Sequence, residues 1–185
     1  MASDNVTGML EAALKGEVDG STRRRAEYST DASTYRVVPL VVAYPKDADD
    51  VAAALAVARE TGVPVTSRGA GTSCAGNAVG PGIVLDFSRH MNKILEIDPE
   101  KRTARVQPGV IEASLQKEAG KYGLRFGPDP STQNRATFGG MIGNNACGPH
   151  AVAYGRTADN VHELTAFLAD GTQIVAGRGD AQVAG

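Results

Sequence analysis

The placement of glycine is the feature that most constrains how this chain can fold. Glycine supplies 22 of the 185 residues, about 12% against an average of about 7%. The glycines gather in three segments, 69–82, 139–148 and 171–185. The first two lie between well-patterned segments, where a backbone without side chains can approach another group closely. The third contains GRGDAQVAG, whose small polar residues are typical of a linker or tail.

The residues before the first glycine segment predict a strand–helix–strand unit. An apolar strand, LVVAY, follows Pro39. Asp47 is a suitable N-cap for the next helix, whose apolar residues recur at helical spacing until Gly62 ends it. The next strand, VPVTS, runs directly into RGAGTSCAG. The chain therefore presents a glycine loop at the end of a strand.

The rest of the chain mixes short strands with helices, which predicts the α+β fold class. GIVLDFS, KILEID and RTARVQPG are expected strands, and the last two form a hairpin over residues 98–101. A helix is expected at about 110–122, ending at Gly123. Its apolar face is expected to comprise Ile111, Leu115, Ala119 and Tyr122. VHELTAFLADGTQIVA predicts a further hairpin that turns at residues 170–171.

Two features are expected near the N-terminus: a short amphipathic helix over residues 6–14, then a polar, irregular segment over residues 20–36.

Composition argues against several classes of protein. Basic and acidic residues nearly balance, 19 against 21, so the chain lacks the basic footprint that nucleic acid requires. No apolar run approaches the roughly 18 residues of a membrane span, and the first residues do not form a secretory signal. Cys74 and Cys147 lie far apart without a CxxC pair, which argues against a disulfide framework and a zinc site. We therefore expect a cytoplasmic protein with no metal.

The first glycine loop fits neither of the two commonest phosphate-binding designs. RGAGTSCAG lacks the lysine of a Walker-type loop, and CAGNAVGPG cannot form the helix that follows a dinucleotide fingerprint. An irregular loop whose successive N–H groups form an anion nest remains possible, with Thr72 and Ser73 as added hydroxyl donors. A tight turn that binds no ligand would explain the same residues.

The second glycine-rich segment favours the ligand-binding interpretation. Its GGMIGNN stretch can form one helical turn whose N–H groups face a second anion site. Asn144 and Asn145 tolerate left-handed backbone angles, and their amides both donate and accept hydrogen bonds. Two such loops in one chain suggest a long ligand that contacts both.

Six segments appear in order along roughly residues 25–176: YSTDASTYRVVPLVVAYP, VPVTSRGAGTS, RTARVQPGV, FGPDPST, TFGGMIGNNACG and YGRTADNV. They resemble the FAD-binding domain of the p-cresol methylhydroxylase and vanillyl-alcohol oxidase family, most nearly its D-lactate, glycolate and D-2-hydroxyglutarate dehydrogenase branch. The resemblance implies FAD extended between two lobes, a small strand–helix lobe and a mainly antiparallel sheet lobe with flanking helices.

The resemblance also implies a division of the chain. A lead-in over residues 1–35 would precede an FAD-binding domain over residues 36–176. Its first lobe would cover about 36–90 and its second about 91–176, incomplete at the C-terminus. Residues 177–185 would form a linker or tail.

The resemblance further implies the cofactor-binding residues. The pyrophosphate of FAD would be held by Arg68, Gly69, Ala70, Gly71, Thr72 and Ser73. The segment passing the flavin ring would be Pro128, Asp129, Pro130 and Ser131. The ribityl and pyrophosphate stretch would be lined by Thr137, Gly140, Gly143, Asn144 and Asn145, with Gly148 closing that loop. The residues toward the flavin or adenine end would be Tyr154, Gly155 and Val161.

Two departures from the family pattern refine this prediction. Some relatives tether FAD through a histidine after the first loop's glycines, where this chain has Thr72, and Cys147 does not match the cysteine that others use. FAD is therefore expected to bind non-covalently. The family's cap domain and its later glycine-rich return segment have no counterpart in these 185 residues. The chain is thus expected to be a fragment of a longer enzyme.

The implied activity is hydride transfer from a 2-hydroxy acid to FAD, which yields a 2-oxo acid. Substrate contacts would come from the cap domain, so no catalytic residue is assigned to these residues, and the chain alone is expected to be inactive. His90, His150 and His162 are interpreted as surface or loop residues. Two alternatives remain open: a domain like that of the enolpyruvoylglucosamine reductases, and a non-enzymatic module that binds nucleotide or phosphate. The second alternative predicts that ADP binds nearly as well as FAD.

Overall fold

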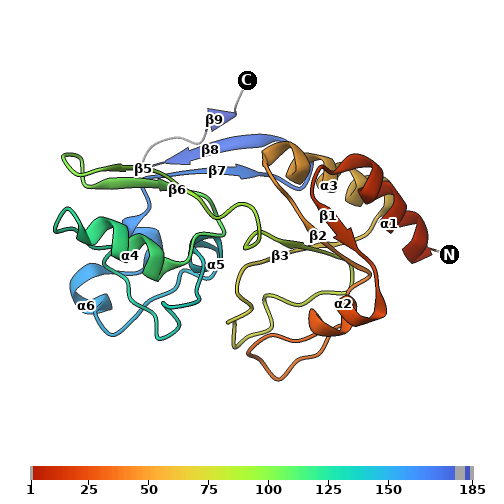
Figure 1. Cartoon of the computed structure of the whole chain (residues 1–185), viewed down its shortest axis with the longest axis horizontal. Coiled ribbons are helices and arrows are strands. Elements are labelled where there is room, and N and C mark those ends of the chain that lie inside the picture. Colours follow the sequence, from red (N-terminus) through yellow and green to blue (C-terminus); the bar gives the residue numbers. More distant parts are fainter. Residues whose placement is uncertain (1, 178–181, 184–185) are drawn as a thin grey trace. The chain divides into compact units, whose positions relative to one another are not determined.

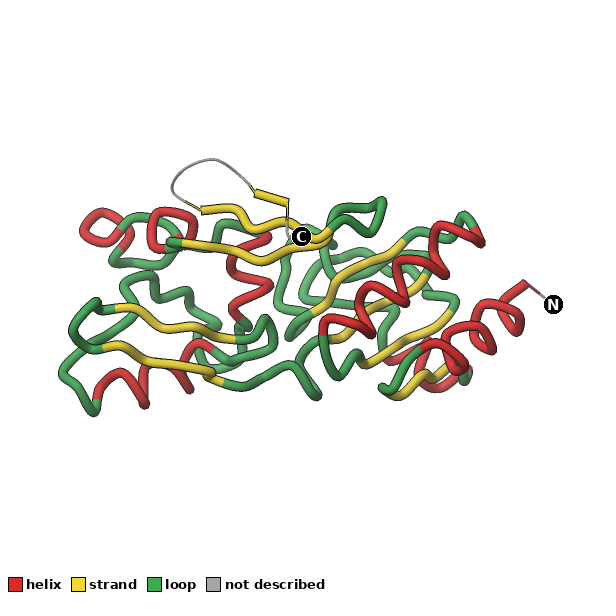
Figure 2. The backbone as a smooth tube through the Cα atoms, turned by 90° about the horizontal axis from the view of Figure 1, so that it is seen from above, coloured by secondary structure: helices red, strands yellow, loops and turns green. Residues whose placement is uncertain are grey.

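The computed structural model describes residues 2–177 and 182–183, and it divides the chain into two compact units (Figures 1 and 2). The first unit comprises the described residues of Met1–Ser67, Ser73–Asp86 and Val161–Gly185. The second unit comprises Arg68–Thr72 and Phe87–Asn160. Mixed helices and small sheets confirm the predicted α+β class. No helix in the described part of the chain is long and apolar enough to cross a membrane.

A four-stranded sheet with the order β1-β2-β4-β3 forms the centre of the first unit. Its strands are β1 (Glu17–Asp19), β2 (Val41–Tyr44), β3 (Val65–Arg68) and β4 (Ile83–Asp86). Strand β2 pairs antiparallel with β1 and parallel with β4. Every residue of β2 and β4 is buried, as expected for the middle strands of a covered sheet. Helix α1 (Ala2–Ala13) packs against α3 (Ala48–Thr61) and against β1 and β2 (Figure 1).

Helix α3 begins and ends as its sequence predicts. The Asp47 side chain accepts a hydrogen bond from Asp50 N at 3.1 Å, and Gly62 ends the helix with φ of +67°. Asp50 is 1% exposed, and its carboxylate accepts the backbone N–H groups of Lys15 (2.9 Å), Gly16 (3.0 Å) and Lys46 (2.9 Å). One buried carboxylate therefore joins the end of α1, the start of β1 and the start of α3.

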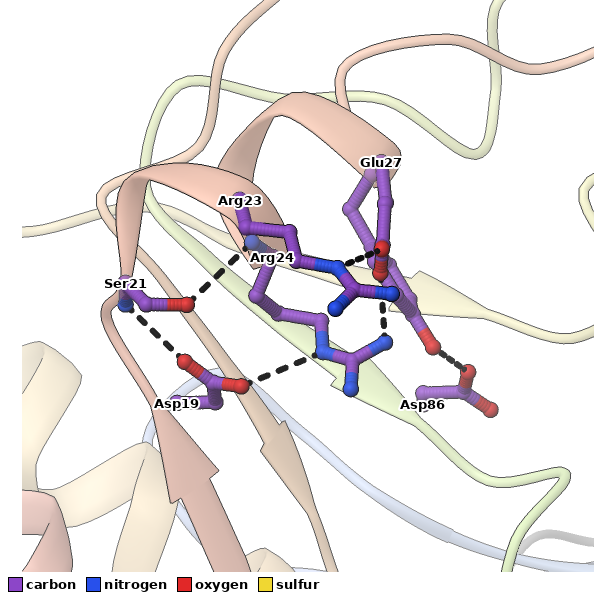
Figure 3. Close-up of polar contacts among 7 residues, drawn as sticks. Asp19, Ser21, Arg23, Arg24, Glu27 and Asp86 are labelled. Carbon is purple, nitrogen blue, oxygen red and sulfur yellow. Dashed lines mark hydrogen bonds and ion pairs between the residues drawn. The ribbon is translucent and has the colours of Figure 1, made fainter.

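Residues 20–36 were expected to be irregular, and that prediction is wrong over Thr22–Glu27, which forms helix α2. Ser21 caps α2 by accepting a hydrogen bond from Arg24 N at 3.3 Å (Figure 3). Arg24 pairs with Asp19 at 3.2 Å and with Glu27 at 2.6 Å, and Arg23 also pairs with Glu27. Local capping and ion pairs thus stabilise a helix too short for an apolar period to reveal.

Tyr28 follows α2 and anchors it to the sheet. Its hydroxyl donates a hydrogen bond to Asp86 Oδ2 at 2.5 Å, and its ring meets that of Tyr44 edge to face at 6.1 Å. The Arg24 guanidinium lies 5.9 Å from the centre of each of these two rings. Burial and the hydrogen bond to Asp86 raise the pKa of the Tyr28 hydroxyl.

The C-terminal part of the first unit is a three-stranded antiparallel sheet of β7 (Glu163–Phe167), β8 (Gln173–Gly177) and β9 (Gln182–Val183). The β7–β8 turn has φ of +87° at Gly171, as the Asp–Gly pair predicts. The tail predicted at residues 177–185 lies largely outside the described residues. Only Gly177, the last residue of β8, and β9 can be placed within it.

The second unit combines one hairpin with short helices. Strands β5 (Ile94–Asp98) and β6 (Thr103–Val106) pair antiparallel as predicted. The helices are α4 (Glu112–Gly120), α5 (Phe138–Gly143), α6 (Ala151–Tyr154) and the 3-10 helix η1 (Thr157–Asn160). The core consists of Val110, Leu115 and Phe138, with Ile94, Ile97, Val106 and Phe126 packed around them.

The apolar face predicted for the second helix is only half correct. Leu115 and Ala119 are buried, whereas Ile111 is 37% exposed and Tyr122 is 56% exposed. Helix α4 spans Glu112–Gly120, so Ile111 lies before its start and Tyr122 lies after its end. The predicted apolar face therefore reached beyond both ends of the helix.

Candidate cofactor-binding site

A cavity of about 470 Å³ lies entirely within the second unit. Its lining residues are Ala70, Ser88, Asn92, Gly109, Ile111, Ser114, Arg135 and Thr137. Hydroxyl, amide and guanidinium groups dominate this set, and all of them can donate hydrogen bonds. The cavity therefore suits a polar ligand that accepts hydrogen bonds, such as a phosphate.

The first glycine loop and the second glycine-rich segment meet at this cavity. Thr137 forms an antiparallel bridge with Ile111, and its hydroxyl lies where a Cβ on Gly69 would be. Phe87 N donates a hydrogen bond to Arg68 O at 3.1 Å, which joins the loop to the start of the following segment. Glycine at position 69 thus lets the loop backbone lie directly against Thr137.

Thr137 carries a polar atom that lacks a partner. The residue is 2% exposed, and among the described residues its Oγ1 has no hydrogen-bond partner. It is the N-cap of α5, yet its side chain makes no capping hydrogen bond. Buried hydroxyls are nearly always hydrogen-bonded. The Oγ1 atom is itself buried beside the backbone of Gly69, so a ligand in the cavity can accept its hydrogen bond once the Thr137 side chain turns or the loop shifts.

The helical turn predicted for GGMIGNN is confirmed as α5, but two of its first N–H groups are already used. Phe138 N donates to Val110 O at 2.9 Å, and Gly139 N donates to Pro108 O at 2.8 Å. These two amides are therefore not free to bind an anion at this end of α5.

The first loop orients its own side chains. Gly71 has φ of +66°, and a Cβ there would clash with the guanidinium of Arg68, which lies over the loop. Ser73 Oγ accepts hydrogen bonds from Ala75 N (3.2 Å) and Asn77 N (3.3 Å) and also contacts Asn77 Oδ1. Ser73 and Val161 belong to the first unit. All the other predicted cofactor-binding residues belong to the second unit.

The segment predicted to pass the flavin ring is mostly buried, with only Ser131 exposed. Asp129 is 9% exposed and contacts His150 twice, through Nδ1 and through a backbone N–H at 3.3 Å. Hydrogen bonding from His150 holds the pKa of the Asp129 carboxyl below its usual range. A Cβ on Gly148 would overlap with Asp129, so glycine there permits this close contact. His150 thus has the loop role that the sequence suggested.

The remaining predicted residues shape the second loop and do not line the cavity. Asn145 has the left-handed φ of +46° that its residue type permits, and its Oδ1 accepts a hydrogen bond from Ala158 N. Asn144 Nδ2 donates to Gly140 O at 3.0 Å. Tyr154 packs over Gly127, and Gly155 turns the chain with φ of +74°. Gly143, the last residue of α5, is exposed.

Sequence reasoning missed six residues of the cavity wall: Ser88, Asn92, Gly109, Ile111, Ser114 and Arg135. A usable signal existed for Ser88, because a polar loop residue just after the buried strand β4 is well placed for binding. Ser114 and Arg135 are exposed residues with no such local pattern. Cys74 and Cys147 are exposed free thiols. Among the residues described, no cluster of His, Cys, Asp or Glu could hold a metal.

Residues 39–177 match the family model of an FAD binding domain, so the chain belongs to this FAD-binding family. It is 40% identical over 179 residues to D-2-hydroxyglutarate dehydrogenase of Pseudomonas putida, covering 93% of this chain and 18% of that protein. It is 39% identical over 171 residues to glycolate oxidase subunit GlcD of Bacillus subtilis, covering 91% of this chain and 36% of the subunit.

A solved structure supports the same assignment. The structure of 6-hydroxy-D-nicotine oxidase from Arthrobacter nicotinovorans superimposes with a TM-score of 0.75 and 31% identity, covering 89% of this chain and 36% of that one. The predicted resemblance to the p-cresol methylhydroxylase and vanillyl-alcohol oxidase family is therefore confirmed. The chain spans well under half of each of these proteins.

Proposed function

We propose that this chain binds FAD non-covalently as part of an enzyme that oxidises a 2-hydroxy acid to a 2-oxo acid. The family assignment and the names of the similar proteins support the cofactor and the substrate class. The observation that carries the proposal is the cavity where the unpaired Thr137 hydroxyl faces the first glycine loop. FAD, when bound, supplies the hydride acceptor, and the protein supplies binding and orientation.

The cavity residues fit the phosphate-bearing part of the cofactor. The Thr137 hydroxyl can donate a hydrogen bond to a phosphate oxygen, and Arg135 supplies positive charge at the same wall. The small residues of Gly69–Gly71 allow the loop backbone to approach the ligand. Pro128–Ser131 and the second loop would extend this site along the rest of FAD.

Non-covalent binding is supported by the residues at the two positions where relatives form a bond to flavin. Thr72 stands in place of the tethering histidine, and a threonine hydroxyl is a weak nucleophile. Cys147 is exposed near the end of the second loop and does not occupy the cysteine position of those relatives. The cytoplasmic location and the division into lobes stay predictions.

Reconstitution tests the cofactor assignment. The purified chain is mixed with excess FAD and desalted, and the flavin-to-protein ratio is read from the visible spectrum. A ratio near one, with the flavin released by acid precipitation, supports non-covalent binding. Colour that stays with the precipitate would refute it. Equal affinities for ADP and FAD would instead favour the phosphate- or nucleotide-binding module.

A pair of variants tests the cavity itself. Thr137→Val removes the hydroxyl and keeps the shape of the side chain. We expect it to weaken FAD binding by about 10-fold or more, the value of one hydrogen bond to a charged group. Thr103→Val is the matched control, because this threonine lies on β6 and does not line the cavity. Equal affinities of the two variants would refute the assignment of the cavity.

A further inference from the structure

The amide of Gln116 holds the backbone of Phe126. Gln116 Oε1 accepts the Phe126 N–H at 3.0 Å, and Gln116 Nε2 donates to Phe126 O at 2.8 Å. These two bonds imitate one step of a β-ladder, with a side chain in place of the neighbouring strand. Phe126 stands two residues before Pro128, where the segment predicted to pass the flavin ring begins. The Gln116 amide thus fixes the backbone at the entry to that segment.

Glu112 supports the orientation of the Gln116 amide. Gln116 Nε2 also donates to Glu112 Oε1 at 2.6 Å. An amide has two N–H donors on one side and an acceptor on the other. The contact with Glu112 therefore favours the same orientation of the amide that the two bonds to Phe126 require. All the hydrogen-bonding groups of this glutamine then have partners.

The burial of Glu112 indicates that this arrangement serves more than packing. Glu112 is 0% exposed in the first turn of α4, and within the described chain its Oε2 has no hydrogen-bond partner. Burial raises the pKa of its carboxyl. A buried acid with an unpaired oxygen costs stability that an apolar residue would not. At this position it orients the amide of Gln116.

The far side of the segment is held independently. Asp129 contacts His150, and the two prolines at 128 and 130 restrict their own backbone angles. The backbone from Phe126 to Asp129 is therefore fixed at its start by Gln116 and at its end by His150. Few backbone bonds between Phe126 and Pro128 can rotate, so a displacement of the Phe126 backbone is passed on to Pro128.

We propose that Gln116 is a positioning residue for the flavin, acting through Phe126 on the segment Pro128–Ser131. This inference rests on the proposed function, since it assigns that segment to the flavin end of FAD. Gln116 itself does not line the cavity, where the phosphates are proposed to bind. Its loss should therefore affect FAD, which carries the flavin ring, and leave ADP binding nearly unchanged.

The test compares Gln116→Met with a matched control, Gln133→Met. Methionine keeps the length of glutamine but makes no comparable hydrogen bonds. Gln133 lies in the same unit and is exposed, and its side chain has no hydrogen bond to any residue that the structure describes. Gln116→Asn is a second variant, because its amide is one methylene too short to reach Phe126. Circular dichroism checks that each variant is folded.

Two readouts are measured for each variant. Hydrogen exchange in the FAD-free chain reports the Phe126 amide, with the Leu124 amide, bonded to Ala119 O, as an internal reference. Titrations with FAD and with ADP give the two affinities. In Gln116→Met we expect about 10-fold faster exchange at Phe126 and about 10-fold weaker FAD binding, the loss expected for about one net hydrogen bond. ADP binding should change less than about 2-fold, and Gln133→Met should resemble the wild type.

The outcomes separate the two proposals. If wild-type chain binds FAD, but the Gln116 variants keep its affinity or lose FAD and ADP equally, the positioning role is refuted while the proposed function survives. If wild-type chain does not bind FAD, the proposed function fails, and the positioning role fails with it. Faster exchange at Phe126 with a selective loss of FAD supports both.

Discussion

The contact between Gly69 and Thr137 allows a quantitative test of the cavity wall. A Cβ on Gly69 would overlap with Thr137 Oγ1 and lie 3.2 Å from Thr137 Cβ. Gly69→Ala therefore forces the loop away from Thr137, and overpacking of this kind costs about 1–3 kcal/mol. Thr137→Ala removes the overlapping oxygen. The remaining 3.2 Å contact between the two Cβ atoms requires a shift of only a few tenths of an ångström.

The single change at Thr137 has two opposing effects on the FAD-free chain. Removing a buried, unpaired hydroxyl recovers about 1–3 kcal/mol of desolvation. Losing the methyl group gives up about 1 kcal/mol of burial. The net change in the free energy of unfolding should therefore be near zero or slightly stabilising. The double variant should be less destabilised than the sum of the single variants by about 1–2 kcal/mol.

Urea unfolding of the wild type, both single variants and the double variant, all without FAD, measures this coupling. Additivity within about 0.5 kcal/mol would refute the contact. Thr137→Ala should also weaken FAD binding without lowering stability. Such a separation is expected where an unpaired polar group is retained for a ligand. If Thr137→Ala strongly destabilised the chain, the hydroxyl would have a structural partner and the argument from its availability would fail.

Three further predictions concern buried carboxylates. Asp50→Ala leaves three backbone N–H groups without their acceptor, so urea unfolding should show a loss of about 3–4 kcal/mol, against a much smaller loss for the exposed Asp49→Ala. Burial raises the pKa of Glu112 from 4.5, so the wild type loses stability as pH rises above about 4.5 and through the raised value. The free energy of unfolding of Glu112→Gln should therefore increase relative to that of the wild type as pH rises. A difference between the two proteins that does not change with pH would contradict this. The pKa of Asp129 is lowered, so its contribution to stability is present above the usual aspartate range and is lost as pH falls through the lowered value. In acid titrations followed by circular dichroism, Asp129→Asn should therefore show a smaller difference in stability between neutral and acid pH than the wild type. An unchanged loss of stability at acid pH would contradict this.

Local patterns in the sequence predicted the elements that depend on local chemistry. Asp47 and Gly62 mark both ends of α3, and the glycine of the β7–β8 turn has the positive φ that a tight hairpin requires. The resemblance to a known family predicted the cofactor, which no local pattern specifies. Failures occurred where the cause is not local. Helix α2 depends on ion pairs and on Tyr28, and Ile111 is exposed because α4 begins one residue after it.

The site was predictable only in part for a similar reason. The glycine loops can be recognised in the sequence, because a glycine such as Gly69 is needed where a backbone lies directly against another backbone or a hydroxyl. Arg135 and Ser114 reach the cavity wall only through the tertiary arrangement of α4 and the segment before α5. The burial of Glu112 runs against its charge, so no hydropathy pattern could have placed it inside.

The membership of five residues in the second unit has a consequence for how such a site can be inherited. Arg68–Thr72 belongs to that unit, although the residues on both sides of it in the sequence belong to the first. The wall of the cavity is therefore encoded in two separate stretches of the gene, with part of another module between them. An excised fragment spanning residues 87–160 would keep Thr137 and Arg135 but lose Ala70 and the glycines beside it. A single transferred segment that keeps the whole wall would have to span residues 68–160 and so carry residues 73–86 of the first unit with it.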